Sequence, residues 1–359
     1  MKTKVLEMTN ASRSVDEIDR QIVHALQIAP RITWSALGEI VGRSPAATAQ
    51  RWERLETQGL AWLVAYESLG TRAAMAFATV TVDMARREST IAALCAHESV
   101  MALSEGARAS QMHVTISADR LEMLIGNVLD EVTRIPGVHD VHARFVARLL
   151  AEGASWRLDA LDAGQRKLAE ESAVRTAPGA WRESSGPIFD EDKKALADAL
   201  IREPRASIAH LADEVGRHEA TVRRQLTALL QSGAVTVRCE MSYDVSGWPI
   251  ERSWFLRVPG GGINALTAVA REYRGLRLVA VTIGDANIVI TALSRTLEES
   301  AAFEARLLDS SAGVTVTETI LHLRTWKRMH RNMGMEGRSV WSDPRGGLQP
   351  APGYGKAAD

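Results

Sequence analysis

Two segments of the chain repeat each other at a constant offset of 174 residues, and this repeat limits the folds that are open to it. "GRSPAATAQRWERLETQG" begins at Gly42, and "GRHEATVRRQLTALLQSG" begins at Gly216. The same offset, without a gap, relates Pro30-Arg31 to Pro204-Arg205, Leu37 to Leu211, Val41 to Val215 and Leu55 to Leu229. Scattered, unrelated helices would not keep this register. Each half of the chain is therefore expected to contain the same helical unit.

The residues before and inside the first repeat carry the signals of three short helices. Ile18, Ile22 and Leu26 lie on one face of a predicted helix that Pro30 ends. Thr33 is a candidate N-cap for a second helix, which a glycine in the left-handed conformation then closes.

A third helix is predicted directly after this glycine. Ser44 is its candidate N-cap, and Pro45 occupies its first position, where the missing N–H costs nothing. Two helices joined by a tight turn behind a first helix predict a helix-turn-helix unit.

The segments that follow each helical unit have a different hydrophobic pattern. "AMAFATVTV", "VMALSEGA", "QMHVTISA" and "GVHDVHARFVARLL" are predicted as strands, interrupted by the helices "STIAALCAHE" and "RLEMLIGNVLDEVTRIP". The order β-α-β-β-α-β is typical of ferredoxin-like folds, and it recurs from "SWFLRVP" to "GVTVTETILHLRTW".

The chain is thus expected to be an α+β protein with two copies of a helix-turn-helix domain followed by a ferredoxin-like βαββαβ domain. The predicted domains are the first helix-turn-helix domain at 15–62, the first ferredoxin-like domain at 72–150, a linker with one helix at 151–188, the second helix-turn-helix domain at 189–236, the second ferredoxin-like domain at 250–328 and a disordered tail at 333–359.

Composition and motifs exclude several classes of protein. The net charge is only -1, so any surface that binds nucleic acid has to be local. Cys95 and Cys239 form no CxxC pair, which argues against a zinc site or a disulfide framework. No secretion signal or membrane span is expected, so we predict a cytoplasmic protein. No Ser-His-Asp, GxSxG or HExxH arrangement is found, and neither an enzyme nor a cofactor is expected.

The domain order resembles that of the Lrp/AsnC (feast/famine) family of prokaryotic transcription regulators. "VDEIDRQIVHALQIAPRITWSALGEIVGRSPAATAQRWERLETQGL" is similar to the N-terminal domain of that family, and "GDANIVI" with "AGVTVTETILHLRTWK" is similar to its ligand-sensing RAM domain. Family members usually carry one copy of each domain, so the resemblance implies a tandem-duplicated member. The implied partners are double-stranded DNA, a small effector such as an amino acid or related carboxylate, and further copies of the chain in a dimer or higher homo-oligomer.

The helix after each Gly-Arg turn supplies the candidate DNA contacts, because a helix in the major groove reads bases with side chains near its N-terminal half. The candidates in the two copies are Arg43, Ser44, Thr48, Gln50, Arg51 and Arg54, and Arg217, His218, Thr221, Arg223 and Arg224. The alternative is an amphipathic surface helix with a solvated arginine face. The second copy has His218-Glu219 where the first has Ser44-Pro45, which leaves open a mainly structural role for one copy.

The turn "TIGDAN" is the candidate effector site. In the family this turn lines the effector site, so the resemblance assigns ligand contacts to Thr282, Gly284, Asp285 and Asn287. Glycine permits close backbone approach, and short polar groups suit the charged ends of an amino acid. The equivalent stretch of the first copy, "SEGARASQM", is open as a silent or altered pocket, and an ordinary β-turn is the alternative in both places.

Three other motifs receive ordinary structural interpretations. Gly260-Gly261-Gly262 lacks the full spacing of a phosphate-binding loop. His139 and His142 point to opposite faces of a predicted strand, so no metal site is expected. The basic run "RTWKRMHRNMGMEGR" is predicted to be a solvated tail, with non-specific DNA contact as the alternative.

These observations predict a sequence-specific DNA-binding transcription regulator that responds to a small effector. The two sensor sheets of one chain are expected to pair with each other. Two alternatives stay open: a nucleoid-type architectural DNA binder with low sequence preference, and an effector-binding assembly protein that has lost DNA binding.

Overall fold

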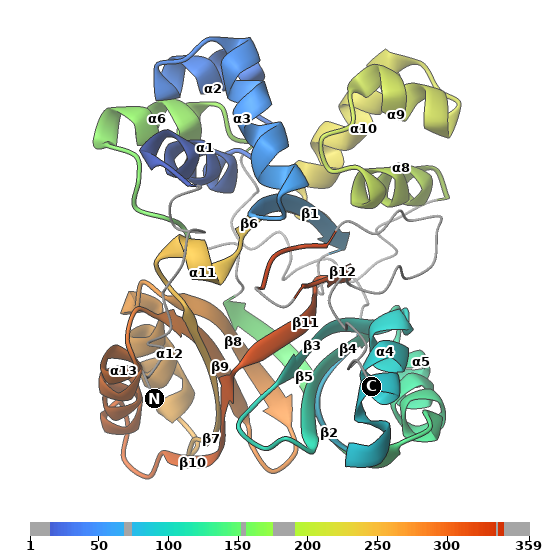
Figure 1. Cartoon of the computed structure of the whole chain (residues 1–359), viewed down its shortest axis with the longest axis vertical. Coiled ribbons are helices and arrows are strands. Elements are labelled where there is room, and N and C mark those ends of the chain that lie inside the picture. The colour runs from blue at the N-terminus through green and yellow to red at the C-terminus, as the bar shows by residue number, and fades with distance from the viewer. Residues whose placement is uncertain (1–14, 68–73, 152–155, 175–190, 335–336, 341–359) are drawn as a thin grey trace, which may run out of the picture.

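The computed structural model describes residues 15–67, 74–151, 156–174, 191–334 and 337–340. Helical units occupy one end of the molecule and a large sheet with its own helices occupies the other (Figure 1). No helix among these residues is long and apolar enough to cross a bilayer.

The first helical unit follows the predicted pattern of caps. It consists of α1 (Glu17–Ile28), α2 (Trp34–Val41) and α3 (Pro45–Thr57), followed by strand β1 (Ala61–Glu67). Thr33 and Ser44 accept hydrogen bonds from backbone N–H groups of α2 and α3. Gly42 ends α2 with φ 64° and ψ 40°, a conformation that glycine adopts without steric cost.

The second helical unit lies beside the first at the same end of the molecule (Figure 1). It consists of α8 (Glu191–Arg202), α9 (Ile208–Val215) and α10 (Glu219–Gln231), followed by strand β6 (Val235–Met241). Gly216 ends α9 with φ 67° and ψ 40°, but His218 at the start of α10 makes no side-chain capping bond. Strands β1 and β6 pair antiparallel in a two-stranded sheet, which joins the two helical units.

A short helix inside the predicted linker packs against the first helical unit. This helix, α6 (Ala163–Glu171), lies where one helix was predicted, and Gln165 Nε2 donates to the carbonyl of Ile40 at 2.7 Å. The segment before it is held by His24, whose Nδ1 accepts from the N–H groups of Ala160 and Leu161. Part of the linker is therefore a component of the first helical core.

One antiparallel sheet forms the other end of the molecule. Its strands are β2 (Ala74–Val82), β3 (Val100–Glu105), β4 (Gln111–Ala118), β5 (Val138–Ala151), β7 (Ile250–Arg257), β8 (Leu276–Ile283), β9 (Ile288–Ser294), β10 (Thr315–His322), β11 (Arg324–Arg328) and β12 (Arg331–Asn332). Their spatial order is β10-β7-β9-β8-β5-β2-β4-β3-β11-β12. Strands β5 and β8 pair along the centre, so the sheets of the two halves join edge to edge, as expected for sheets that pair within one chain.

Helices cover one face of each half of this sheet (Figure 1). They are α4 (Arg87–Ala96) and α5 (Leu121–Gly126) on the first half, and α12 (Gly262–Glu272) and α13 (Leu297–Asp309) on the second. A 3-10 turn (Met84–Arg86) precedes α4, a π-helical turn (Asn127–Glu131) and a 3-10 turn (Val132–Arg134) follow α5, and α11 (Tyr243–Ser246) follows β6. Leu94 and Leu124 are buried under the first pair, and Phe303 and Leu307 are buried under the second.

The basic run near the C-terminus is part of the sheet, which differs from the predicted solvated tail. Strand β11 pairs with β3 of the first half, with Arg324 opposite Glu105. Pairing is favoured here because β3 would otherwise present an open edge. Met333 is buried and bridges Ser339, so ordered structure continues past the predicted start of the tail at residue 333. Residues 335–336 and 341–359 of that predicted tail lie outside the described residues.

Candidate DNA-binding and ligand-binding sites

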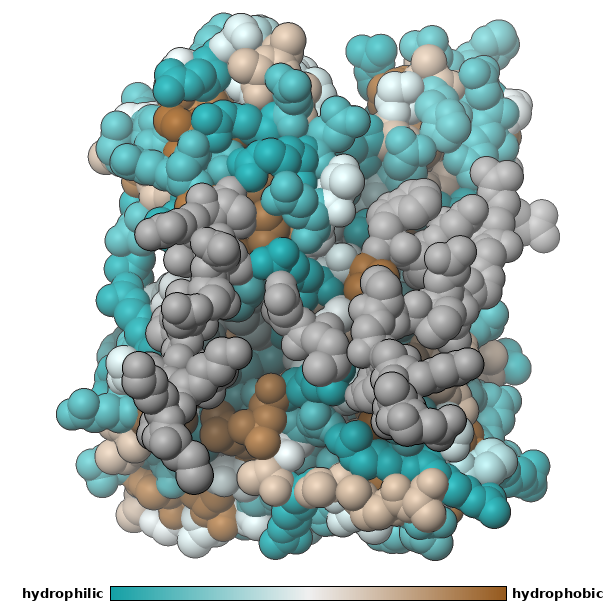
Figure 2. Space-filling view, viewed as in Figure 1, coloured by the Kyte–Doolittle hydropathy of each residue, from teal (hydrophilic) through white to brown (hydrophobic). Residues whose placement is uncertain are grey.

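The candidate DNA contacts at the start of α3 lie at the surface, with one exception. Arg43, Ser44 and Gln50 are exposed. Thr48 is fully buried, and its hydroxyl donates to the carbonyl of Ser44 at 3.0 Å. Hydrophilic side chains cover most of both helical units on the face seen in Figure 2.

The other two arginines of α3 are held by two carboxylates at the start of α1, those of its N-cap Asp16 and of Asp19. Arg51 Nη1 lies 2.8 Å from Asp16 Oδ2 and 2.8 Å from Asp19 Oδ1, and Arg54 Nη2 lies 2.5 Å from Asp19 Oδ2. Burial alone would raise the pKa of Asp16, but hydrogen bonds from the Asp19 N–H and from Arg51 lower it. Both arginines stay about one-third exposed, so each joins two helices while keeping part of its side chain at the surface.

Most of the candidates at the start of α10 lie at the surface. His218, Arg223 and Arg224 are exposed, and Thr221 is half-buried. Arg217 donates to Gln225 Oε1 at 3.2 Å. The two helices thus present different side chains at corresponding positions.

The loops before α2 and α9 bind each other through two arginines. Arg31 donates to the carbonyls of Pro204 and Ala206 at 2.5 and 2.8 Å, and Arg205 donates to the carbonyls of Pro30 and Ile32 at 2.8 and 2.7 Å. Burial lowers the pKa of both guanidinium groups, that of Arg205 to about 10. The two helical units are therefore fixed relative to each other by a partly buried contact, which the sequence repeat did not predict.

Two polar side chains of the candidate effector turn form hydrogen bonds to the protein backbone. The hydroxyl of Thr282 is buried and donates to the carbonyl of Ala286 at 3.0 Å. The amide of Asn287 bonds both the N–H and the carbonyl of Val258, each at 2.8 Å. The assignment of Thr282 and Asn287 to ligand contacts remains a prediction.

The acidic residue of this turn pairs with an arginine of the other half of the sheet. Arg144 on β5 donates through Nε and Nη2 to the two carboxylate oxygens of Asp285, at 2.6 and 2.8 Å, and also pairs with Glu318 at 2.8 Å. These bonds from Arg144 hold the pKa of Asp285 at about 2. Gly284 has φ 155°, and a Cβ at this position would come within 3.3 Å of Arg144 Cγ. The turn therefore locks the β5–β8 junction.

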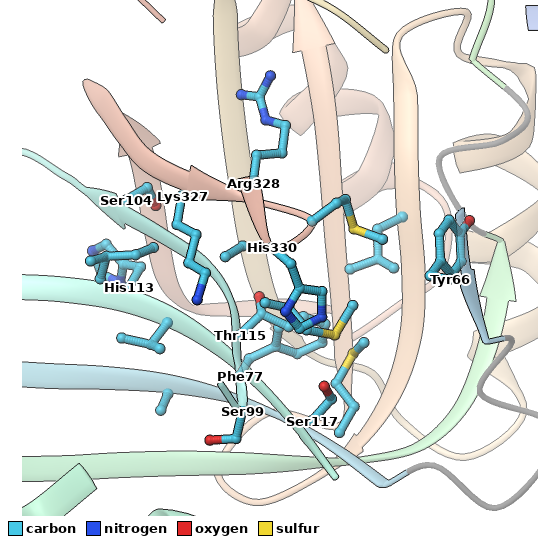
Figure 3. Close-up of a pocket in the computed structure, with 18 of the residues that line it drawn as sticks. Tyr66, Phe77, Ser99, Ser104, His113, Thr115, Ser117, Lys327, Arg328 and His330 are labelled. Atoms are coloured by element: carbon cyan, nitrogen blue, oxygen red, sulfur yellow. The ribbon is translucent and has the colours of Figure 1, made fainter. Parts of the chain in front are cut away.

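A central cavity of about 680 Å³ lies between the two halves of the sheet and β11, and no sequence motif had pointed to it. Strands β2, β3 and β4 supply one wall, while β7 to β10 supply the other. Figure 3 shows His113, Thr115, Phe77 and His330 around this space. The cavity joins residues that are far apart in the sequence, which explains why periodicity alone did not identify it.

A chain of hydrogen bonds centred on His322 crosses this cavity. Nδ1 of His322 lies 2.7 Å from Ser104 Oγ of the first half, and Nε2 lies 2.8 Å from Ser253 Oγ of the second. The ring of His113 meets that of His322 edge-on, with centroids 6.1 Å apart. Burial lowers the pKa of His322, and it lowers the pKa of His113 to about 3, so both rings are neutral at pH 7.

Four cationic side chains of the described residues also line the cavity. Arg238 and Arg277 pair with the buried carboxylate of Glu240, and Arg328 pairs with Glu251 at 3.3 Å. The fourth, that of Lys327, is buried and has its Nζ 2.9 Å from the carbonyl of His97.

The tip of the β11–β12 hairpin borders the cavity in a strained conformation. Met329 and His330 have φ values of 47° and 64°, and both line the cavity. Tight hairpins of this kind favour asparagine or glycine, because other side chains collide with the backbone at positive φ. Strain of this kind persists only where the surrounding structure over-determines it, and it concentrates at functional sites.

None of these groups forms an evident metal centre. No cluster of three or more histidine, cysteine, aspartate or glutamate side chains with metal-binding geometry occurs in the described part of the chain. Cys95 and Cys239 are both free thiols, and burial raises their pKa values.

Comparison with known proteins gives a family match for a short N-terminal segment and a similar fold for most of the chain. The model of the AsnC-type helix-turn-helix domain matches residues 15–56, which include α1, α2 and most of α3. No curated protein sequence matches the chain significantly.

Among solved structures, the siroheme decarboxylase NirDL has a similar fold over nearly the whole chain. It is 14% identical, with 88% of this chain and 93% of NirDL covered and a TM-score of 0.57. NirDL in complex with an iron-uroporphyrin III analogue gives the same coverage and identity with a TM-score of 0.53. AsnC of E. coli is 17% identical over 38% of this chain and 95% of its own, with a TM-score of 0.33. At these identities, the likeness to NirDL shows a shared fold.

Proposed function

We propose that the chain is a DNA-binding transcription regulator of the Lrp/AsnC type, in which two duplicated halves act as an internal pair. The observation that carries this proposal is the reciprocal contact of Arg31 and Arg205, which holds the two helical units together. The AsnC-type match at residues 15–56 and the constant offset of the repeat support it. Regulators with two paired helix-turn-helix units bind two half-sites of DNA, and the distance between these units sets the spacing of the half-sites.

The two helix-turn-helix units are proposed to contact different half-sites. Arg43 and Gln50 are exposed on the first unit, whereas Arg223 and Arg224 are exposed on the second. Arginine pairs with guanine or phosphate, and glutamine pairs with adenine. An operator for this chain should therefore be asymmetric, in contrast to the palindromes that identical subunits read.

The direct test is titration of labelled DNA from the upstream region of the protein's own gene against a shuffled fragment, at two salt concentrations. A specific regulator prefers the native fragment, and the preference survives the higher salt. Equal binding of both fragments that disappears with salt would identify an architectural binder. No binding to either fragment at low salt would identify an effector-binding assembly protein.

Arginine variants locate the DNA surface in the same assay. Arg223→Ala and Arg224→Ala remove exposed side chains, and each should weaken binding by on the order of 1–3 kcal/mol if it contacts a base edge, or reduce the salt slope by about one if it contacts phosphate. Arg257→Ala, which changes an exposed arginine of β7 in the large sheet, is the matched control and should leave affinity unchanged.

The effector, the assembly and the location belong to the same proposal. The effector is an amino acid or a related carboxylate, chains associate further into dimers or larger homo-oligomers, and the protein acts in the cytoplasm without enzymatic activity. Light scattering of the purified chain, with and without DNA, measures the assembly. A strictly monomeric chain in both states would remove the oligomer from the proposal.

A second candidate is an enzyme that removes carboxyl groups from a tetrapyrrole. The fold shared with NirDL over 88% of this chain, together with a cavity lined by His113, His322 and Lys327, favours it. The test is incubation with siroheme followed by mass spectrometry, in which each decarboxylation removes the mass of one CO2. An unchanged substrate mass, together with specific DNA binding, would leave the regulator as the function.

A further inference from the structure

Lys327 lines the central cavity, and no carboxylate of the described residues comes within ion-pairing distance of its ammonium. Its side chain is 5% exposed, and among the described residues it forms no ion pair. The one hydrogen bond from its ammonium goes to a neutral carbonyl, that of His97. Burial lowers the pKa of Lys327, against weaker opposing effects of Cys95 and Glu98. Burying a charge without a partner is costly, so an anion that enters the cavity would be bound strongly at this position.

The neighbouring cations do not share this property. Arg328 pairs with Glu251, and Arg238 and Arg277 share Glu240. Figure 3 shows the side chain of Lys327 extending into the space between His113 and His330, while Arg328 extends the opposite way from the same strand. Adjacent residues of a strand point to opposite faces, so Lys327 and Arg328 leave β11 on opposite sides.

A second residue that lines the cavity carries a buried polar atom without a partner among the described residues. Nδ1 of His113 is buried and has no hydrogen-bond partner among the described residues. Unsatisfied buried nitrogen atoms are rare in native proteins and call for an explanation such as a missing ligand or water. A ligand with a carboxylate on Lys327 and a hydrogen-bonding group near His113 would satisfy both side chains.

The size and walls of the cavity define the rest of the ligand. A volume of about 680 Å³ falls in the range of roughly 300–1,000 Å³ that drug-sized ligands occupy, and a single amino acid would leave most of it empty. Phe77, Leu278, Met75 and Met101 provide apolar walls. Methionine side chains adapt their shape to the ligand, which suits a broad apolar body.

The strained hairpin tip connects this cavity to the helical units. The N–H of His330 donates to the carbonyl of Met101 at 2.9 Å, which holds the tip against the cavity wall. Met329 packs in one cluster with Trp62 and Val64 of β1. Strand β1 belongs to the small sheet that joins the two helix-turn-helix units, so a ligand that displaces the tip also displaces this cluster.

From these observations we infer that the central cavity holds the effector of the proposed regulator, and that this effector has a broad apolar body and a carboxylate bound by Lys327. The inference rests on the proposed function in that it names the site of its effector, and of the effector classes proposed there it selects a carboxylate larger than a single amino acid. It places the effector away from the turn at residues 282–287, where Asp285 is already paired with Arg144.

A pair of fluorescent probes that differ only in charge tests this assignment. The wild-type chain is titrated with 1-pyrenebutyrate and with the neutral alcohol 1-pyrenebutanol, and binding is followed by pyrene emission. The carboxylate should bind at least tenfold more tightly than the alcohol. Lys327→Met should remove this preference, and Lys327→Arg should retain it. Lys167→Met, which changes an exposed lysine of α6, should behave as wild type.

Equal affinity of the wild type for both probes, or an intact charge preference in Lys327→Met, would overturn the assignment. The variant should fold, because methionine replaces a buried unpaired charge with an apolar chain of similar length. As an independent variant, Met101→Trp should reduce binding of both probes by filling the cavity. Retained binding in Met101→Trp would place the probes elsewhere.

The DNA titration separates this inference from the proposed function. Lys327→Met without probe should bind DNA as the wild type does, since Lys327 lies in the large sheet. Wild-type protein that binds pyrenebutyrate through Lys327 but no DNA would contradict the regulator and keep the ligand site. Specific DNA binding without charge-selective probe binding would contradict the ligand site and keep the regulator.

Discussion

Arg31 and Arg205 each donate two hydrogen bonds to the backbone of the loop that carries the other. The acceptors are related in the same way as the donors, because Pro30 and Pro204 stand one residue before the two arginines. Equivalent residues on the two sides thus make equivalent hydrogen bonds. This reciprocity is typical of a two-fold symmetric dimer interface, and here it occurs within one chain. Arg205 also stacks on the ring of Trp34, with its guanidinium 4.0 Å from the ring centroid.

Removing this contact should weaken the arrangement of the helical units. The double variant Arg31→Met and Arg205→Met keeps apolar stems but leaves buried carbonyls without donors, at a cost of about 1–3 kcal/mol for each arginine. Urea unfolding followed by circular dichroism measures the loss. Arg223→Met, at an exposed position of α10, is the control and should stay within about 0.5 kcal/mol of wild type. An unchanged midpoint in the double variant would show that the contact does not contribute to stability.

Two glycines with the same backbone conformation should respond differently to alanine. Gly42 and Gly59 both have φ 64°, but a Cβ at Gly42 meets open space, whereas at Gly59 it collides with the backbone carbonyl of Ser339. Gly42→Ala should cost on the order of 1–2 kcal/mol, the usual penalty of the left-handed conformation. Gly59→Ala should cost more, and it should release residues 337–340, which limited proteolysis detects. Equal losses in both variants would contradict the docking of this segment at Gly59.

The carboxylate of Asp285 should stabilise the fold only above acidic pH. Its pKa in the folded chain is about 2, below the usual 3.8, because Arg144 donates two hydrogen bonds to it. The stabilisation is therefore complete above about pH 4 and is lost as the pH falls through 2. Asp285→Asn should lower stability at pH 7 by about 1 kcal/mol, a small value because the carboxylate is 42% exposed.

Urea midpoints at pH 7, 4 and 2.5 measure this effect of Asp285. The difference between wild type and Asp285→Asn should shrink toward the lowest pH. Asp309→Asn, at an exposed position of α13, should show no such trend. A difference that is constant with pH would exclude the ion pair as its cause.

His24 should make the fold sensitive to mild acid. Its pKa in the folded chain is lowered to about 4, mainly by burial and further by Arg166 and Arg157, and its neutral Nδ1 accepts two backbone N–H groups. Between about pH 6.5 and pH 4 the unfolded chain binds a proton that the folded chain does not. The free energy of unfolding should therefore decrease as the pH is lowered through this window, by up to about 1.4 kcal/mol per pH unit.

Asparagine isolates the contribution of His24 from those of the other histidines. The amide oxygen of His24→Asn can accept the same N–H groups but does not titrate. The stability of this variant should fall less steeply than that of wild type between pH 6.5 and pH 4. His139→Asn, at an exposed position of β5, is the control. Parallel pH profiles of wild type and His24→Asn would exclude His24 as an acid-sensitive group.

The helical units could be predicted from the sequence because their signals are local. Ser44 and Pro45 mark the start of a helix, and Gly42 marks the end of the one before. The order of strands and helices along the chain could be predicted from the period of apolar residues within short windows. Both kinds of signal depend on neighbours a few positions apart, which a single sequence displays directly.

The candidate sites were harder to predict because they depend on contacts across long stretches of chain. The pairing of Arg144 with Asp285 spans 141 positions, and that of Arg51 with Asp19 spans 32. No periodic pattern records which charged side chains meet after folding. For the same reason the sequence did not predict the central cavity. It also did not predict that the basic run around Lys327 pairs with the sheet, and the run was therefore predicted to be a solvated tail.

The pairing of β11 with β3 has a consequence for the order in which the molecule forms. The first half of the chain leaves the ribosome with β3 at the edge of its sheet, and the strand that covers this edge, residues 324–328, is synthesised only after the whole second half-sheet up to β10. An uncovered edge strand is a template for pairing with other chains. The nascent protein therefore carries an edge strand that is open to pairing until residues 324–328 have been synthesised.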